Sequence, residues 1–311
     1  MNNSTFLYAT ILALATATIS GTNNFLTKIA VTAIKDPIVY TTLKNALVAV
    51  ALAGILILFK KWGEISKLNA REYVLLALIG IVGGSIPFAL YFTGLAQTTA
   101  LNAGLIHKTL FLWVMLLAVP ILKERVTFLY LVGAGMIFAA NFFVGGFNGF
   151  KFNAGELMIL SATLLWAVEN IIAKIALKSI SSLTVAASRM IFGSVILGLF
   201  MFWQGNGGVI LTLNSEQWGW VLLTSALLTG YVLTWYSALK YASATYVATL
   251  LVPATLITNL LSSIFITHAL KMNEAFSALF YTLGTALVIV AMIKAVKKTR
   301  FQRAEYIMPS A

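Results

Sequence analysis

Long apolar stretches separated by short polar links make up most of this chain, and each stretch is long enough to cross a membrane as a helix. Such a helix needs about 20 apolar residues. Of the 311 residues, 60% are hydrophobic and only 10% are charged, whereas soluble domains usually carry about 25% charged residues. The sequence therefore predicts an all-α integral membrane protein. The ten spans that we expect lie near residues 6–34, 38–59, 72–95, 99–121, 126–146, 154–178, 182–204, 217–239, 243–268 and 274–294. We expect the first span to remain in the mature protein, because it is too long for a signal-peptide core.

The formal net charge of +12 is distributed as membrane topology requires. If both termini are cytoplasmic, 13 of the 21 Lys and Arg residues fall in cytoplasmic segments and 3 in outer loops. The positive-inside rule produces this skew. The charge thus indicates a multi-pass inner-membrane protein rather than a partner of nucleic acid. Residues 295–311 are expected to form a basic cytoplasmic tail that lies against anionic lipid.

A repeat divides the chain into two halves. The sequence Asn-Phe-Leu-Thr-Lys-Ile-Ala at 24–30 returns as Asn-Ile-Ile-Ala-Lys-Ile-Ala at 170–176, and Lys44 matches Arg189 at nearly the same offset. Five spans per half is an odd number, so the second half is inverted relative to the first. We expect residues 1–148 and 149–294 to be two inverted five-helix repeats in one bundle. Such duplication is typical of secondary transporters that work by alternating access.

Short motifs then point to a family. Glu124-Arg125-Val126-Thr127 opens the fifth span, with Gly133 and Gly135 after it, and Asn102-Ala103-Gly104-Leu105 begins the fourth. With the inverted repeat and the basic residues of spans 2 and 7, these motifs make the chain resemble the drug/metabolite transporter superfamily, EamA type. The resemblance implies ten helices around a central substrate site, lined by helices 1, 3, 4, 6, 8 and 9. Two departures are visible: Phe111 stands where the family has a proline in helix 4, and the link after helix 9 reads His268-Ala269-Leu270-Lys271, without a Glu-Arg pair.

Ionisable residues inside spans normally face a cavity or a partner. Glu169 is the acid that we place well inside a span, where an apolar setting disfavours its charged form. It is our candidate for proton coupling; a fixed ion pair with Lys28, Lys108 or Lys174 is the alternative. Lys108, near the centre of the fourth span, is a candidate for binding a substrate carboxylate or phosphate, or for pairing with Glu169. For His107 we expect packing or an interhelical hydrogen bond, with pH sensing as the alternative.

Two polar stripes follow helical spacing. Ser20, Asn24 and Lys28 share one helix face, as do Trp166, Asn170 and Lys174. Polar residues on one face of an apolar helix point to a cavity or to a neighbouring helix. We therefore count both asparagines and both lysines as candidate substrate-binding residues, although the lysines are close enough to the span ends to snorkel.

Further candidates are aromatic, amide-bearing or kink-forming residues. Aromatic rings within spans either pack or stack on a substrate. The expected substrate-binding residues from this group are Tyr91, Asn102, Trp113, Trp166, Trp235 and Tyr236; the expected gating or structural residues are Lys44, Arg189, Glu124, Pro87 and Pro253. The prolines mark expected helix kinks.

Several chemistries lack their residues. The chain has no cysteine, and two histidines without clustered acids do not form a metal site. No P-loop is visible. We therefore expect no catalytic residues, no metal and no cofactor, and a protein that is not an enzyme.

These observations favour a secondary transporter of small polar metabolites. An acid, lysines, asparagines and rings in the spans suit an amino acid, possibly aromatic, or a related zwitterion, exported with possible proton coupling. One alternative is uptake or exchange of an organic anion or phosphorylated metabolite, with Lys28, Lys108 and Lys174 as the clamp. The alternative from another class is a non-transporting membrane sensor or enzyme. Expected partners are the small-molecule substrate and membrane lipid, and nucleic acid is not expected. Small residues such as Gly133, Gly135 and Gly284 either pack closely within the monomer or form the seam of a homodimer.

Overall fold

The computed structural model describes residues 3–144, 149–269 and 272–307, and within these ranges every regular element is a helix. Nine of the described helices are long and apolar enough to cross a membrane, and Phe128–Phe143 is a shorter apolar helix. The prediction of an all-α membrane protein is confirmed. The fifth span is shorter than expected, and the last helix is longer.

The first half contains four spans, two of which are interrupted, and then the shorter apolar helix. Their elements are α1 (Asn3–Ile34), α2 (Pro37–Leu58), the short α3 (Trp62–Ile65), the broken pair α4 (Ala70–Gly84) and α5 (Ile86–Leu95), the broken pair α6 (Ala100–Lys108) and α7 (Leu110–Leu122), and α8 (Phe128–Ala140) with η1 (Asn141–Val144).

The second half follows a similar order, although its third span is continuous. Its elements are α9 (Ala154–Ala176), α10 (Ser182–Trp203), η2 (Asn206–Thr212), α11 (Ser215–Tyr241), the broken pair α12 (Ala244–Leu251) and α13 (Ala254–Ser262), η3 (Ser263–Thr267), and α14 (Met272–Ile307). Since α14 continues through Ile307, the expected tail is helical for much of its length.

Polar residues at the links fix where the helices begin. Asp36 accepts hydrogen bonds from the backbone N–H groups of Ile38 and Val39, and Pro37 follows it at the first helical position. Asn69 and Asn214 each form a capping box with the residue three positions on. Such caps satisfy N–H groups that the first turn of a helix leaves unpaired.

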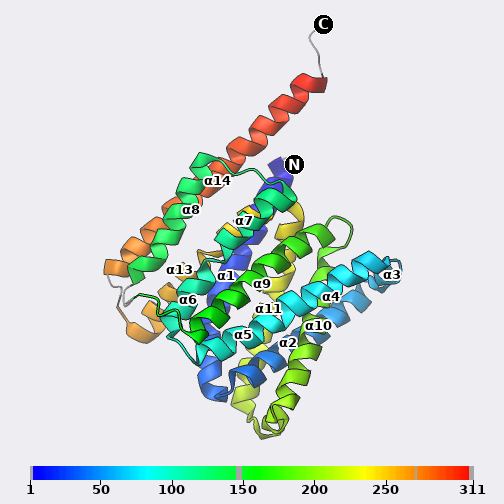
Figure 1. The fold of residues 1–311 in the computed structure, drawn as a ribbon, viewed down its shortest axis with the longest axis vertical. Coiled ribbons are helices and arrows are strands. Elements are labelled where there is room, and N and C mark those ends of the chain that lie inside the picture. The colour runs from blue at the N-terminus through cyan, green and yellow to red at the C-terminus, as the bar shows by residue number, and fades with distance from the viewer. Residues whose placement is uncertain (1–2, 145–148, 270–271, 308–311) are drawn as a thin grey trace.

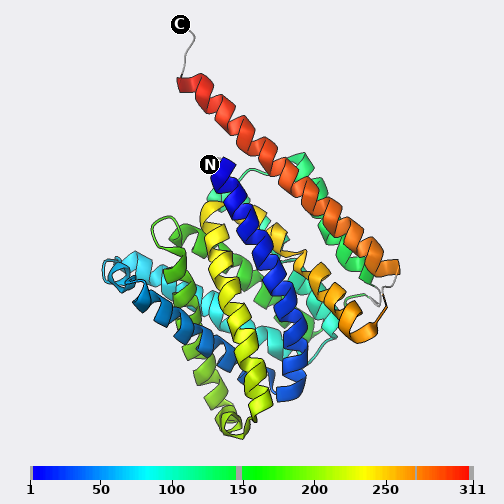
Figure 2. The same cartoon turned by 180° about the vertical axis from the view of Figure 1, so that it is seen from behind.

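The two halves interlock rather than sit side by side. The main packing partners of most helices belong to the other half: α1 packs on α11, α2 and α4 on α10, α5 on α9, and α8 on α14. Figure 2 shows α1 lying along α11. The repeats therefore form one bundle.

The bundle has two ends, which we call the terminal face and the loop face. The terminal face is the end where α1 begins, and it also holds the links 123–127, 177–181 and 242–243; the loop face is the opposite end, with the links 35–36, 96–99, 149–153 and 204–214. At one edge, α8 and α14 form a pair, and α14 extends past the rest of the bundle at the terminal face (Figure 1).

Candidate functional site

Glu169 lies at the centre of a buried polar cluster where α9, α10 and α11 meet. Its side chain is only 2% exposed. The hydroxyl group of Tyr236 donates a hydrogen bond to Glu169 Oε1 at 2.5 Å, and the guanidinium of Arg189 attracts the carboxylate electrostatically. The alternative hypothesis from the sequence was an ion pair of Glu169 with a lysine; the structure has Arg189 beside Glu169 instead. We call Glu169, Arg189 and Tyr236 the polar centre.

The break in the third span brings a backbone carbonyl group to the polar centre. The carbonyl of Gly83, in the last turn of α4, accepts hydrogen bonds from Arg189 Nη2 at 3.1 Å and from Trp166 Nε1 at 3.0 Å. A Cβ atom at Gly83 would collide with the Glu169 side chain. Glycine is therefore required where α4 passes the acid.

An aromatic wall adjoins the polar centre. It consists of four rings from the third, fourth and sixth spans: Phe88, Tyr91, His107 and Trp166. The ring of Trp166 lies 4.8 Å from that of His107, 5.8 Å from Tyr91 and 5.2 Å from Phe88. The structure thus brings two sequence candidates, Tyr91 and Trp166, together with a histidine that the sequence assigned to packing. His107 Nδ1 is buried without a hydrogen-bond partner among the described residues.

The fourth span breaks between α6 and α7 at Thr109, next to Lys108. Lys108 is partly buried, and within the described residues no carboxylate lies against it. Trp113 donates a hydrogen bond from its Nε1 to the Thr109 hydroxyl at 3.0 Å, which braces the break. The break forms although Phe111 replaces the proline of the family pattern.

Asn24 and Asn170, equivalent in the repeat, differ in exposure. Asn24 is exposed on the helix face that also carries the buried Ala13 and Ala17. Asn170 is buried; its amide donates to the Trp166 carbonyl, and its Oδ1 has no partner among the described residues. The side chain of Lys28 lies outside what the structure describes.

Other candidates make contacts that tie helices together. Lys174 Nζ donates to the carbonyls of Leu239 and Ala242, each at 2.5 Å, at the end of α11. Asn102 donates to Glu156 Oε1 at 2.6 Å. Trp235 instead stacks on Tyr231 within the same helix, α11, with ring centroids 6.1 Å apart.

The remaining candidates sit at helix ends, breaks or buried faces. Pro87 lies in the first turn of α5, just after the α4–α5 break, and Pro253 lies between α12 and α13. Lys44 is 8% exposed, and its ammonium lies 4.9 Å from the centre of the Tyr40 ring. The kinks expected at both prolines are confirmed as helix interruptions.

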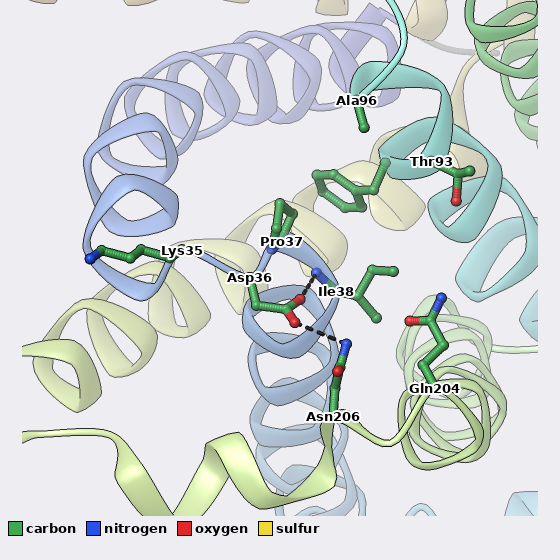
Figure 3. Close-up of a pocket in the computed structure, with 9 residues that line it drawn as sticks. Lys35, Asp36, Pro37, Ile38, Thr93, Ala96, Gln204 and Asn206 are labelled. Atoms are coloured by element: carbon green, nitrogen blue, oxygen red, sulfur yellow. Dashed lines mark hydrogen bonds between the residues drawn. The ribbon is translucent and has the colours of Figure 1, made fainter.

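A pocket of about 530 Å³ opens at the loop face between the two halves. It is lined by Lys35, Asp36, Pro37, Ile38, Phe92, Thr93, Ala96, Gln204 and Asn206. Figure 3 shows Asn206 donating to the Asp36 carboxylate, a bond of 3.0 Å, while the Lys35 side chain extends away from that pair. The sequence predicted none of these residues as site residues, since they stand in links or at the ends of α2 and α5, where nothing in the sequence marks a site.

Two more residues of the site were missed but had a signal in the sequence. By the repeat offset of 146, Asn23 is the residue of the first half that corresponds to Glu169. Asn23 is buried, and its Oδ1 has no hydrogen-bond partner among the described residues. The other is Gly83, which stands beside a second glycine in the third span. No group of three or more His, Cys, Asp or Glu residues able to hold a metal ion occurs in the described part of the chain.

Interlocked repeats, interrupted helices and a buried charged centre define the class: a membrane transporter built from two five-helix repeats. The model of the EamA-like transporter family matches both repeats, at residues 7–146 and 153–290, and the chain belongs to that family.

Relatives agree with this assignment at the level of the class. An uncharacterized transporter of Methanothermobacter thermautotrophicus is 23% identical over 157 residues, which cover 49% of this chain and 44% of the relative. The uncharacterized transporter YyaM of Bacillus subtilis is 29% identical over 157 residues, 48% of this chain and 50% of the relative. Each match thus spans about half the length of the curated relative. A solved crystal structure, titled only as that of a protein, shares the fold at a TM-score of 0.72 and 18% identity, over 90% of this chain and 95% of its own.

Proposed function

We propose that this protein exports amino acids or related zwitterions with a bulky or aromatic side chain, in exchange for protons that bind Glu169. The observation that carries the proposal is the polar centre beside the aromatic wall. An acid buried among helices of both halves is typical of a coupling group.

Proton binding at Glu169 would alter contacts that join three helices. The carboxylate of Glu169 on α9 accepts from Tyr236 on α11 and attracts Arg189 on α10. A neutral carboxyl group no longer attracts the guanidinium, so protonation loosens α9 from α10. That change can be coupled to the movement of the repeats in alternating access.

The substrate groups have candidate partners in the same region. The rings of the aromatic wall, buried at Trp166 and partly buried at the other three, suit an apolar or aromatic side chain. Lys108 suits the carboxylate as a point charge. Asn24 and Asn170, with donors and acceptors, suit the amine or carboxylate. Lys28, Asn102, Trp113, Lys174 and Trp235 remain candidates, although Lys174 already donates to backbone carbonyls.

The orientation in the membrane follows from charge. Basic residues gather in the terminal-face links, among them Lys60, Lys61, Lys67, Lys123 and Lys178. The positive-inside rule therefore favours an inner-membrane protein with the terminal face in the cytoplasm.

The first experiment is a thermal-unfolding screen of the purified protein against amino acids, organic anions, sugar phosphates and planar cations. A ligand at 100 times its dissociation constant adds about 2.7 kcal/mol if it binds only the folded state. Stabilisation by aromatic or other amino acids supports the proposal. Stabilisation by anions alone supports the organic-anion carrier. Lys108, which has no carboxylate against it in the described part of the chain, also suits an anion.

The proton role is tested in proteoliposomes with Glu169→Gln. Transport of a ligand found in the screen is measured with and without a pH gradient. The variant is expected to bind the ligand and to lose the response to the gradient. Glu216→Gln, at the exposed start of α11, is the matched control and keeps the response. A Glu169→Gln variant that still responds to the gradient contradicts proton coupling through this residue.

A further inference from the structure

Glu124 clasps the start of the ninth span from the other half of the protein. It lies in the link between α7 and α8, and its carboxylate accepts hydrogen bonds from the backbone N–H groups of Ala244 at 2.6 Å and Thr245 at 3.0 Å. The Thr245 hydroxyl donates a third bond at 2.7 Å. Ser243, the N-cap residue of α12, makes no capping bond with its own side chain. Glu124 thus takes the place of that cap.

The clasp lies at a boundary between helices that line the transport path by family resemblance. At the terminal face, α7 and α12, the halves of the fourth and ninth spans nearest that end, pack on each other. At the loop face, no comparable packing joins α6 to α13 among the described residues. Asn24 is exposed on the inner face of α1 toward that end. This difference in packing and the exposure of Asn24 point to a bundle that is closed at the terminal face and open at the loop face.

The second half has the same backbone geometry but lacks the acid. Lys123 ends α7 in the left-handed conformation with φ of 56°, and His268 ends η3 in the same conformation with φ of 50°. The residue that follows is Glu124 in the first half and Ala269 in the second. Thr99, the N-cap residue of α6, corresponds to Ser243. The inverted counterpart of the Glu124 clasp would therefore run from position 269 to the start of α6.

We propose that Glu124 holds the terminal-face gate shut, and that Ala269 leaves the loop-face gate without the matching clasp, so that the empty carrier rests open at the loop face. This inference is independent of the substrate and of proton coupling. A carboxylate at the start of a helix gains charge-assisted hydrogen bonds and a favourable interaction with the helix dipole. An alanine methyl group gains neither. The two closed states, otherwise related by the repeat, therefore differ in stability.

The test uses the absence of cysteine from the chain. One single-cysteine reporter is Asn24→Cys at the loop-face opening. The other is Ala248→Cys in α12, where Ala248 is 3% exposed. The rate of labelling of each reporter by a water-soluble maleimide is measured in the purified protein, without ligand. In the parent background, Asn24→Cys is expected to react fast and Ala248→Cys slowly.

Removing the clasp and installing its counterpart are expected to shift the reporters in the same direction. Glu124→Gln weakens the terminal-face gate, and Ala269→Glu strengthens the loop-face gate once it closes. Each is expected to lower the labelling-rate ratio of Asn24→Cys to Ala248→Cys by roughly tenfold, because a hydrogen bond to a charged group contributes about that factor. Adding Ala269→Glu to Glu124→Gln is expected to lower the ratio further.

Glu64→Gln is the matched control. Glu64 also caps a helix of the other half at the terminal face, since it accepts from Ser181 N at 2.7 Å and from the Thr184 hydroxyl at 2.9 Å. That helix, α10, packs on α2, away from the gate. The control is expected to leave the ratio unchanged. A ratio that stays constant in Ala269→Glu and in Glu124→Gln, in protein that unfolds cooperatively, overturns the proposal; so does a shift of equal size in Glu64→Gln.

Discussion

Arg189 and Lys44 occupy matching positions of the two repeats, yet their surroundings differ. Arg189 faces the carboxylate of Glu169 and the Gly83 carbonyl. Lys44 lies over the Tyr40 ring, and the position corresponding to Glu169 is Asn23, an amide. One buried cation is thus compensated by an acid and the other by a ring.

This difference predicts that the same substitution changes stability by different amounts at the two positions. Arg189→Met leaves Glu169 buried without its cation, and the loss of one partner of a buried pair costs about 3–5 kcal/mol. Lys44→Met exchanges a buried charge for an apolar chain of similar length, so we expect a change within about 1 kcal/mol of zero or a gain. The comparison is made by thermal unfolding in one detergent. Equal destabilisation of both variants would contradict this account of Lys44.

The spacing of residues along the sequence does not determine which side chains meet in the bundle. The sequence identified Glu169, Tyr236, Trp166 and Tyr91 as separate candidates, because each is polar or aromatic within a span. It did not pair Glu169 with Arg189, since helix rotation and the choice of neighbour depend on packing across the whole bundle. The choice between Asn23 and Asn24 depends on the same rotation, which a difference of one residue changes by about 100°.

At the scale of elements, the pair α8 and α14 shows where the glycines of the fifth and tenth spans pack. Sequence analysis left Gly133 and Gly284 open to packing inside the monomer or at a dimer seam. A Cβ atom at Gly133 would lie 2.8 Å from the Gly284 carbonyl oxygen, and one at Gly284 would lie 2.7 Å from the Gly133 carbonyl oxygen. The two glycines therefore permit close contact of helices within one chain.

Gly284→Leu is expected to destabilise the protein without changing its oligomeric state. The added side chain would separate α8 from α14, and overpacking of this kind costs about 1–3 kcal/mol or more. Thermal unfolding measures the loss, and light scattering in detergent measures the mass. Gly135→Leu, where a Cβ atom would meet nothing within 4 Å, is the control and leaves stability nearly unchanged. A change of mass in Gly284→Leu alone would place the seam between two chains.

The elements themselves were largely predictable. Apolar length fixed the spans to within a few residues, and the prolines at 87 and 253 marked two of the three interruptions. The third, at Thr109, has no proline at the break, and it depends on tertiary packing and on the Trp113–Thr109 bond. The helical continuation of α14 to Ile307 was also missed, because span prediction stops where apolar residues end.

At the scale of the whole molecule, acids in the links hold the halves together outside the membrane. Glu64 joins the α2–α4 link to the start of α10. Burial raises the pKa of Glu64, but hydrogen bonds from Ser181 and Thr184 and the charge of Lys61 lower it by more, so the net pKa is below the usual 4.5. A carboxyl group with a lowered pKa stabilises the folded state most when it is ionised.

The pH dependence follows from that sign. The contribution of Glu64 is fully present above its unfolded pKa of about 4.5 and is lost as the pH falls through the lower folded value. Glu64→Gln is therefore expected to lower the unfolding temperature at pH 7 and to narrow its gap to the parent protein toward pH 3. Thermal unfolding between pH 3 and pH 8 measures both curves. A gap that stays constant across this range would show that Glu64 does not act through its charge.

The interlocking of the repeats has a consequence for how the protein is assembled. Most helices find their main packing partner in the other half, so neither half produced alone would bury the surfaces that hold it together. A gene divided before the codon for Asn153 would encode two polypeptides that depend on each other to fold. Expressed together, they are expected to form an obligate heterodimer with the same architecture. Its dissociation constant would measure the free energy of association between the two halves, which in the intact chain is part of the free energy of folding.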